Sequence, residues 1–153
     1  MTNIDPEIVK RLSSIKWAYA DKDFSARKEL EKKIAKTGRN YELISYSSLV
    51  ENIPFMLPAI GPNPRFIRTN DWQGLDRRIV GDFLGHLNME SYIKAGFFSS
   101  ALVIGKEHSQ PSDIFFEWME SIGILPNLNE DTVLKFWVDE VHKAHRFYNN
   151  KPV

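Results

Sequence analysis

Apolar residues recur every third or fourth position between residues 75 and 87, which predicts an amphipathic helix. The apolar stripe consists of Leu75, Ile79, Val80, Phe83, Leu84 and Leu87. Asp71 is the expected N-cap of this helix, and Gly96 is expected to end the helical region. The opposite face carries Asp76, Arg77, Arg78, Asp82 and His86. Because that face is polar and has charges of both signs, we expect it to be available to a partner.

Two glycines, Gly81 and Gly85, lie inside this predicted helix. Each costs about 1 kcal/mol relative to alanine, so either the helix bends there or another backbone packs closely against it. We favour close packing. After Gly96, a nearly continuous apolar run covers residues 97–104 and ends at Gly105. Its length and flanks predict a buried strand, and we expect the rest of the chain to pack on this helix and strand.

Two helices are predicted near the N-terminus. The first begins at Asp5-Pro6-Glu7, which combines a capping carboxylate, a proline in the first turn and an acid at the positive end of the helix dipole. Its stripe is Ile8, Leu12, Ile15 and Tyr19. A polar break at 21–23 leads into the second helix, which is expected to end at Gly38. The two helices should form a hairpin over residues 1–40, with the basic face of the second serving mainly as solvated surface.

The next segments are a short helix and a long connection. Residues 44–50 are typical of a short extended stretch followed by a serine-capped helix, which Ile53-Pro54 ends. Residues 54–74 contain Pro54, Pro58, Pro62 and Pro64, so they predict a long ordered loop or an extended arm. Phe66 and Ile67 are expected to point inward. The loop is either functional or a surface insertion between helices.

Two further helices are predicted toward the C-terminus. One begins at Pro111-Ser112-Asp113 and ends at Gly123, and the other begins at Asn129-Glu130-Asp131. The sequence therefore predicts a mostly α (α+β) fold with one or a few short strands. We expect a single domain over 1–153, made of the helical hairpin (1–40), a winged-helix-like centre (41–125) with the proline-rich insertion, and a C-terminal helix (126–153).

Composition narrows the classes of function. Twenty basic and twenty acidic side chains cancel, so no overall positive field attracts nucleic acid or anionic lipid. The absence of cysteine excludes disulfides, thiolate metal sites and cysteine nucleophiles. Asp5 and Glu7 stand where a signal peptide would have a basic region followed by an apolar one, and the sequence has no apolar run long enough to cross a bilayer. We expect a cytoplasmic protein that does not associate with membranes.

Residues 44–116 resemble two groups of proteins. The run Ile44-Ser45-Tyr46-Ser47-Ser48-Leu49 is similar to the Ile-Thr-Tyr-Gly-Glu-Leu run that begins the helix-turn-helix of alkyltransferase-like DNA-binding proteins. The pair Leu84-Gly85, the run from Ser100 to Ile104, Pro111 and Phe115-Phe116 also resemble a widespread set of uncharacterised bacterial proteins. The resemblance implies a winged-helix-like centre and DNA binding. Alkyl transfer needs an acceptor cysteine, which this chain lacks, so that activity is not implied.

The preferred functional hypothesis is a non-enzymatic interaction module without a cofactor. It would bind nucleic acid or a protein partner through Arg77, Arg78 and the arm around Arg65 and Arg68. The protein partner includes a second copy of the chain, as in a homodimer or an oligomer whose apolar surface a neighbour completes. This hypothesis needs no residue that the sequence lacks.

The alternative hypothesis is a small metal-dependent enzyme. His142 and His145 are three apart on the last helix and Asp139 precedes His142 by one turn, so one face could present two imidazoles and a carboxylate to a metal. A serine nucleophile at Ser99 or Ser100 with His108 is disfavoured, because the sequence has no nucleophile elbow. Core packing is the preferred interpretation for most of the tryptophans, which are Trp17, Trp72, Trp118 and Trp137.

Overall fold

The computed structural model describes residues 4–70 and 72–150. Within them the protein is mostly helical with one small sheet, which confirms the predicted mostly α (α+β) class. The α-helices are α1 (Pro6–Ser13), α2 (Phe24–Arg39), α3 (Tyr46–Val50), α4 (Gly74–Ala95), α5 (Asp113–Ser121) and α6 (Glu130–Asn150). The remaining elements are the 3-10 helices η1 (Ala20–Lys22) and η2 (Ser99–Leu102) and the strands β1 (Ile44–Ser45) and β2 (Val103–Ile104).

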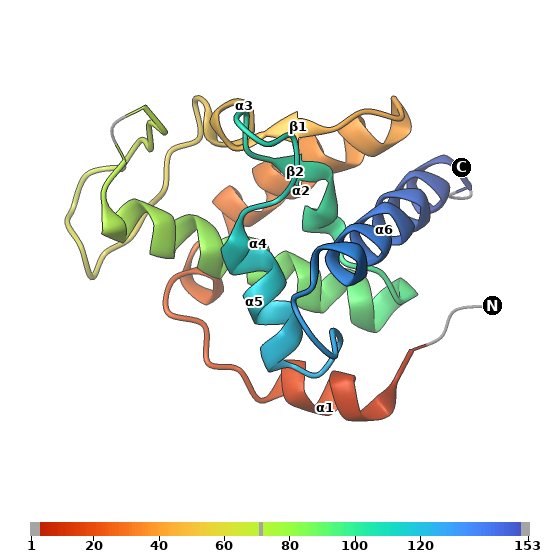
Figure 1. Cartoon of the computed structure of the whole chain (residues 1–153). Helices are drawn as coiled ribbons and strands as arrows, with labels where there is room; N and C mark the ends of the chain where they lie inside the picture. The colour runs from red at the N-terminus through yellow and green to blue at the C-terminus, as the bar shows by residue number, and fades with distance from the viewer. Residues whose placement is uncertain (1–3, 71, 151–153) are drawn as a thin grey trace.

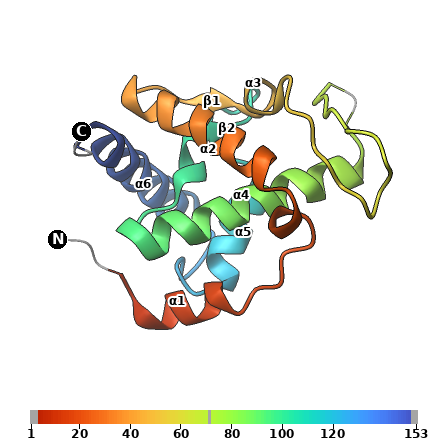
Figure 2. The same ribbon diagram turned by 180° about the vertical axis from the view of Figure 1, so that it is seen from behind.

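Helix α4 crosses the middle of the molecule, with α2 and α3 on one side and α1 and α5 on the other (Figures 1 and 2). Its apolar stripe is buried as predicted apart from Leu75, which is only partly buried, and Ile79 and Phe83 are completely inaccessible to solvent. Gly96 adopts the left-handed conformation with φ of 75° and ends the helix, also as predicted. Asp71, the predicted N-cap, lies outside the described residues. The last helix, α6, packs against α2 and η2.

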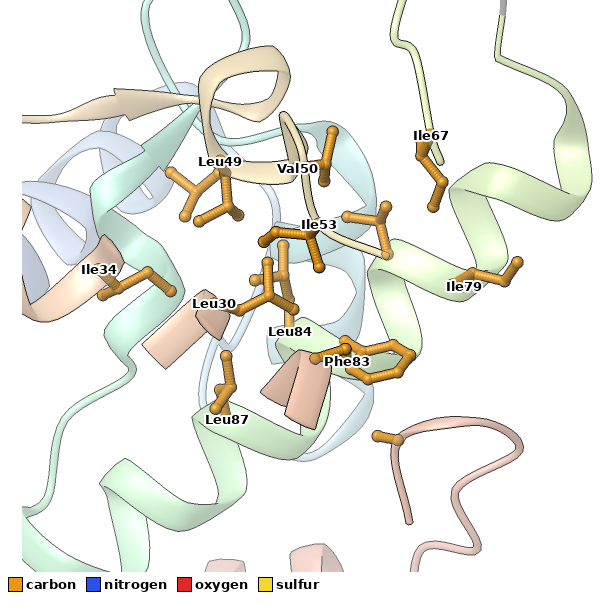
Figure 3. Packing of buried hydrophobic residues seen from close by; sticks show 14 of the residues in the cluster. Leu30, Ile34, Leu49, Val50, Ile53, Ile67, Ile79, Phe83, Leu84 and Leu87 are labelled. Atoms are coloured by element: carbon orange, nitrogen blue, oxygen red, sulfur yellow. The ribbon is translucent and has the colours of Figure 1, made fainter. Parts of the chain in front are cut away.

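The main core joins α2, α3 and α4 (Figure 3). In the close-up, Leu30 from α2, Leu49 from α3 and Phe83 from α4 converge on Ile53, which follows α3. Burying one such side chain contributes roughly 1.5–3 kcal/mol. A second cluster lies where α1 and α5 meet the C-terminal part of α4 and the start of η2, and it contains Ile8, Leu12, Tyr92, Phe98, Phe115 and Met119.

The predicted strand over 97–104 is wrong, although residues 97–103 are buried as expected. The structure has η2 there and only two strand residues, Val103 and Ile104, which pair in parallel with β1. The reason is that side chains take up the backbone donors. The N–H of Phe98 donates to Glu140 Oε1 at 2.9 Å, and the N–H of Ser100 donates to Asn88 Oδ1 at 2.9 Å. These donors therefore do not need a neighbouring strand.

The predicted hairpin over residues 1–40 is also wrong. The helix starts at Pro6 as predicted, with Asp5 accepting a hydrogen bond from the N–H of Glu7, but it ends at Ser13. Both α1 and α2 pack on α4, and they lie on opposite sides of it (Figure 2). Gly38 does not end α2, because the helix continues to Arg39 and Asn40 is its C-cap.

The long connection between α3 and α4 is irregular, as predicted. An antiparallel bridge between Phe55 and Arg65 closes it into a loop. Ile67 is buried as expected, but Phe66 is 56% exposed, so its predicted inward position is wrong. Phe55 and Leu57 supply the buried side chains in its place. The loop is therefore fixed to the core at both its start and its end.

Candidate binding cavity

A cavity of about 580 Å³ lies beside the N-terminal half of α4, within the size range of roughly 300–1,000 Å³ typical of ligand sites. We call it the aromatic cavity. Its lining comes from α4, α5, η2, the start of α3, the segment that precedes η1, and the residues just before α4 and α5. The aromatic lining residues are Trp17, Tyr19, Tyr46, Trp72, Phe115 and Trp118. The polar lining side chains are Arg77, Arg78, Asp82, Asn88, Ser100 and Ser112.

Trp17 lies against α4 because Gly85 has no side chain. A Cβ atom at Gly85 would lie 2.8 Å from Cζ3 of Trp17 and 3.1 Å from Cη2. The close packing predicted for the helix glycines is therefore found at Gly85, but with an indole ring in place of a backbone. A Cβ at Gly81 would have no neighbour within 4 Å, and this glycine borders the cavity.

Asp82 fixes the segment that carries Trp17 and Tyr19. Its Oδ1 accepts a hydrogen bond from the N–H of Ala18 at 3.0 Å, and its Oδ2 accepts from Tyr19 at 2.9 Å and from Ala20 at 2.8 Å. Hydrogen bonds to an ionised carboxylate contribute about 1.5–3 kcal/mol, more than those between neutral groups. One side chain of α4 thus holds a wall of the cavity that is more than sixty residues away in sequence.

Another part of the cavity lining holds an arginine against an aromatic ring. The guanidinium of Arg77 lies 5.1 Å from the centre of the Trp72 ring, a cation–π distance. The Tyr46 ring is 6.2 Å from the same indole, and its hydroxyl oxygen accepts a hydrogen bond from the N–H of Ser112. These contacts place a cation and two aromatic rings on the same part of the cavity.

The four predicted arginines are not brought together. Arg77 and Arg78 are exposed and line the cavity. Arg65 is occupied elsewhere, since its Nε lies 2.7 Å from Oδ1 of the buried Asp76 and fixes the loop to α4. Arg68 is exposed on that loop and does not line the cavity. The structure thus separates the two cavity arginines from the two on the loop.

The polar face of α4 is largely occupied within the molecule, so the expectation that the whole face is available to a partner is wrong. Asp76 and Asp82 are bound as described, and His86 is only 5% exposed. The Nε2 atom of His86 lies 3.0 Å from Nη1 of Arg27, and the Trp17 ring packs edge-on against the imidazole. Only Arg77 and Arg78 of the five residues remain exposed.

The alternative metal site does not form a cluster. In the part of the chain that the structure describes, no three His, Asp or Glu side chains are arranged to hold a metal ion. Asp139 and His142 are exposed on α6, and Nε2 of His145 lies 3.0 Å from the backbone oxygen of Glu42. The disfavoured serine site is also dispersed, because Ser99 is buried whereas His108 is exposed in a turn after β2.

Two ionisable groups stabilise the elements that carry cavity residues. Glu140 accepts the N–H of Phe98 just before η2, which carries Ser100, and burial raises the pKa of this carboxyl. Lys33 donates to the backbone oxygens of Ser48 and Leu49 at the end of α3, the helix that carries Tyr46, and burial lowers its pKa. Both groups position the cavity from outside it.

Sequence reasoning missed the tryptophans as cavity residues. Trp17, Trp72 and Trp118 do pack on the two core clusters, but each also lines the cavity. Trp137 fits the core interpretation and donates its indole N–H to the backbone oxygen of Ala101 at 2.8 Å. The three cavity tryptophans come from distant segments, so no spacing connects them. Gly85 was the one signal in the sequence, because a glycine inside a helix can admit a bulky group such as the Trp17 ring.

Comparisons with known proteins return nothing for this chain: no protein-family model, no curated protein and no solved structure matches it. None of the described helices has the length and apolar character needed to cross a membrane. What the protein binds is therefore inferred from the residues of the cavity.

Proposed function

We propose that the protein binds nucleic acid at the aromatic cavity, with an unpaired base between the aromatic walls and phosphates on Arg77 and Arg78. The observation that carries this proposal is the combination of a cavity lined by six aromatic side chains with two exposed arginines beside it. The resemblance to the alkyltransferase-like module, which stays a proposal, points to the same class of partner. Such a role fits a cytoplasmic location.

Each component has a physical function in this proposal. Stacking a base on an aromatic side chain contributes roughly 1–3 kcal/mol to binding, whichever base it is. A guanidinium can donate two parallel hydrogen bonds to one phosphate, which fixes the backbone next to the stacked base. A base inside a duplex does not expose its faces, so single strands and unpaired positions should bind better than continuous duplex.

The charge distribution makes the expected affinity modest. The chain has no net charge, so attraction must come from the local arginine pair. With two phosphate contacts on a single strand, the logarithm of the binding constant should fall with the logarithm of salt concentration with a slope of about −1.4. Binding should therefore be micromolar and moderately sensitive to salt.

The test is fluorescence anisotropy with a labelled single strand of roughly 12 nucleotides, measured at low and at physiological salt. The wild type is compared with the double variant Arg77→Ala, Arg78→Ala. A matched control, Lys32→Ala with Lys36→Ala, removes the same charge from the exposed side of α2. We expect the cavity variant to lose at least about tenfold in affinity and most of its salt dependence, and we expect the control to bind nearly as the wild type does.

Three results would contradict the proposal. They are no binding at low salt, equal losses in the cavity variant and the control, and preference for continuous duplex over the single strand. The first would leave a protein partner, including a second copy of the chain, as the better hypothesis. Arg68→Ala provides a further check, because Arg68 lies outside the cavity and its removal should have a small effect.

A further inference from the structure

The floor of the aromatic cavity contains two buried polar side chains, Asn88 from α4 and Ser100 from η2. They are 2% and 3% exposed, so their hydrogen-bonding groups are shielded from bulk water. Groups of this kind discriminate strongly between ligands, because an unmatched donor or acceptor stays unpaired when water is excluded.

The orientation of the Asn88 amide follows from its contact with a backbone group. The N–H of Ser100 lies 2.9 Å from one end of the amide, and a backbone N–H can only donate, so that end is the oxygen Oδ1. The other end is therefore Nδ2, which donates to Oγ of Ser100 at 2.8 Å. The two residues form a closed ring of two hydrogen bonds, and the Ser100 N–H allows only this orientation of the Asn88 amide.

This orientation of the amide leaves two donor hydrogens without partners at the floor of the cavity. Nδ2 of Asn88 carries two hydrogens and uses one on Ser100. Ser100 Oγ accepts that hydrogen bond, so its own hydroxyl hydrogen is available to another acceptor. The floor therefore presents donors, while the acceptor Oδ1 is already occupied by a backbone N–H.

Most of the other polar groups around the cavity keep this character, and only the exposed Ser112 hydroxyl of the lining can both donate and accept freely. Arg77 and Arg78 have donors only. Asp82 is the one carboxylate of the lining, and its two oxygens already accept three backbone N–H groups. The Tyr46 hydroxyl oxygen accepts the N–H of Ser112, which leaves its hydrogen for another acceptor. The cavity thus suits a planar ring with acceptors on its edge.

We propose that Asn88 and Ser100 are specificity residues that donate hydrogen bonds to a ring oxo group, so that the cavity selects uracil-type bases over cytosine. This inference rests on the proposed function. Uracil and cytosine have nearly the same size and stacking surface, but position 4 carries an oxo acceptor in uracil and an amino donor in cytosine. An amino group in that place would face the two donors and leave the donors and the amino group without acceptors. The strand of uridines should therefore bind about tenfold more tightly than the strand of cytidines.

The experiment measures binding of labelled oligodeoxyuridylate and oligodeoxycytidylate of roughly 12 nucleotides by fluorescence anisotropy. The wild type should bind the uridine strand about tenfold more tightly. Asn88→Asp keeps an oxygen for the Ser100 N–H but replaces the Nδ2 donor with an acceptor, so its preference should reverse toward cytidine. Ser100→Ala removes one donor and should lower the preference to about threefold. Circular dichroism checks that each variant is folded.

The outcomes separate this inference from the proposed function. Equal binding of the two strands by the wild type overturns the specificity inference and leaves nucleic-acid binding intact. Binding of neither strand overturns both. A wild-type preference that persists unchanged in Ser100→Ala and in folded Asn88→Asp also overturns the inference, and Ser100→Ala alone decides if Asn88→Asp does not fold. Competition with uridine and cytidine monophosphates shows whether the recognised base belongs to a strand or to a free nucleotide.

Discussion

Two glycines inside helices of this molecule, Gly38 on α2 and Gly81 on α4, pack in opposite ways. Where α2 meets α6, Gly38 is buried against Tyr148, and Asn149 donates a hydrogen bond to the Gly38 oxygen at 3.0 Å. On α4, Gly81 borders the aromatic cavity and has no neighbour where a Cβ would be. A glycine inside a helix can thus admit a neighbouring ring or leave a space, and only the partner element decides which.

The contact between α2 and α6 should therefore matter mainly for stability, and the cavity mainly for the proposed binding. Tyr148 packs edge-on against the rings of Phe97 and Phe147, and burial raises the pKa of its hydroxyl. This contact leaves no room for a Cβ atom at Gly38. Around the cavity the aromatic residues are instead held by polar contacts, such as those of Asp82, and part of their surface remains open. Substitutions at the contact between α2 and α6 should lower stability more, the more side-chain volume they add. Around the cavity, the loss of a polar contact such as that of Asp82 should matter most.

The largest effect is expected at the contact between α2 and α6. In Gly38→Ala the new Cβ would lie 2.8 Å from Cγ and 3.0 Å from Cβ of Tyr148, atoms too close to the α6 backbone to swing away. Overpacking should outweigh the roughly 1 kcal/mol gained in helix propensity and lower the free energy of unfolding by about 2–3 kcal/mol. Urea denaturation of the wild type and of Gly38→Ala measures this loss of unfolding free energy.

A double-mutant cycle with Tyr148→Ala provides the control for this prediction. In that background the alanine at position 38 has no ring to meet, so it should be neutral or stabilising, with a coupling energy of about 2 kcal/mol or more. Equal cost of Gly38→Ala in both backgrounds would mean that Tyr148 does not close this face.

The second effect tests the polar anchor of the cavity. Asp82→Asn removes one acceptor oxygen and the charge that together hold three backbone N–H groups, so the free energy of unfolding should fall by about 2 kcal/mol. The exposed Asp139→Asn on α6 is the matched control and should change stability by less than about 0.5 kcal/mol. Equal effects of the two substitutions would show that the segment with Trp17 does not depend on this carboxylate.

A third test uses pH to probe the buried Glu140 on α6. Burial raises the pKa of Glu140 above its ordinary value of 4.5, so the folded state holds this proton to higher pH than the unfolded state does. The stability that Glu140 contributes is therefore present below pH 4.5 and declines as pH rises through the folded pKa. The stability of the wild type minus that of Glu140→Gln should fall between pH 4 and pH 7 in urea titrations. A difference that rises over this range would contradict the assignment.

The smallest effect compares two glycines four residues apart. Gly81→Ala adds a methyl group in open space and should raise stability by up to about 1 kcal/mol, the gain in helix propensity. Gly85→Ala would press on the Trp17 ring and should be less stable than Gly81→Ala by about 1 kcal/mol. Thermal melts with tryptophan fluorescence measure both. An equal gain in the two variants would mean that Trp17 moves freely into the cavity.

Local patterns predicted the helices well. Asp5-Pro6 starts α1, Ser45 caps α3 by accepting the N–H of Ser48, and α5 and α6 begin where their capping residues indicate. The long loop before α4 was also predicted. These features depend on residues a few positions apart, so a single sequence contains the information.

Features that depend on distant residues could not be predicted. The apolar run from 97 became a 3-10 helix because Asn88 and Glu140 bind its backbone N–H groups, and neither residue is close to it in sequence. The expected hairpin failed because α4 lies between α1 and α2. The cavity combines side chains from Trp17 to Trp118, and only the arginine pair at 77 and 78 was singled out in advance as a binding feature.

The contact between α2 and α6 also has a consequence for the time course of synthesis. Asn149 and its neighbour Tyr148 follow Gly38 by 111 and 110 residues, so α6 is translated long after the face of α2 that it covers. At about 5–20 residues per second, the ribosome needs roughly 6–22 seconds to add them. During that interval the face of α2 around Gly38 lacks its native cover, and exposed surface of this kind is where nascent chains aggregate or meet chaperones. Premature stops before α6 should therefore yield insoluble chains even though every cavity residue has already been made.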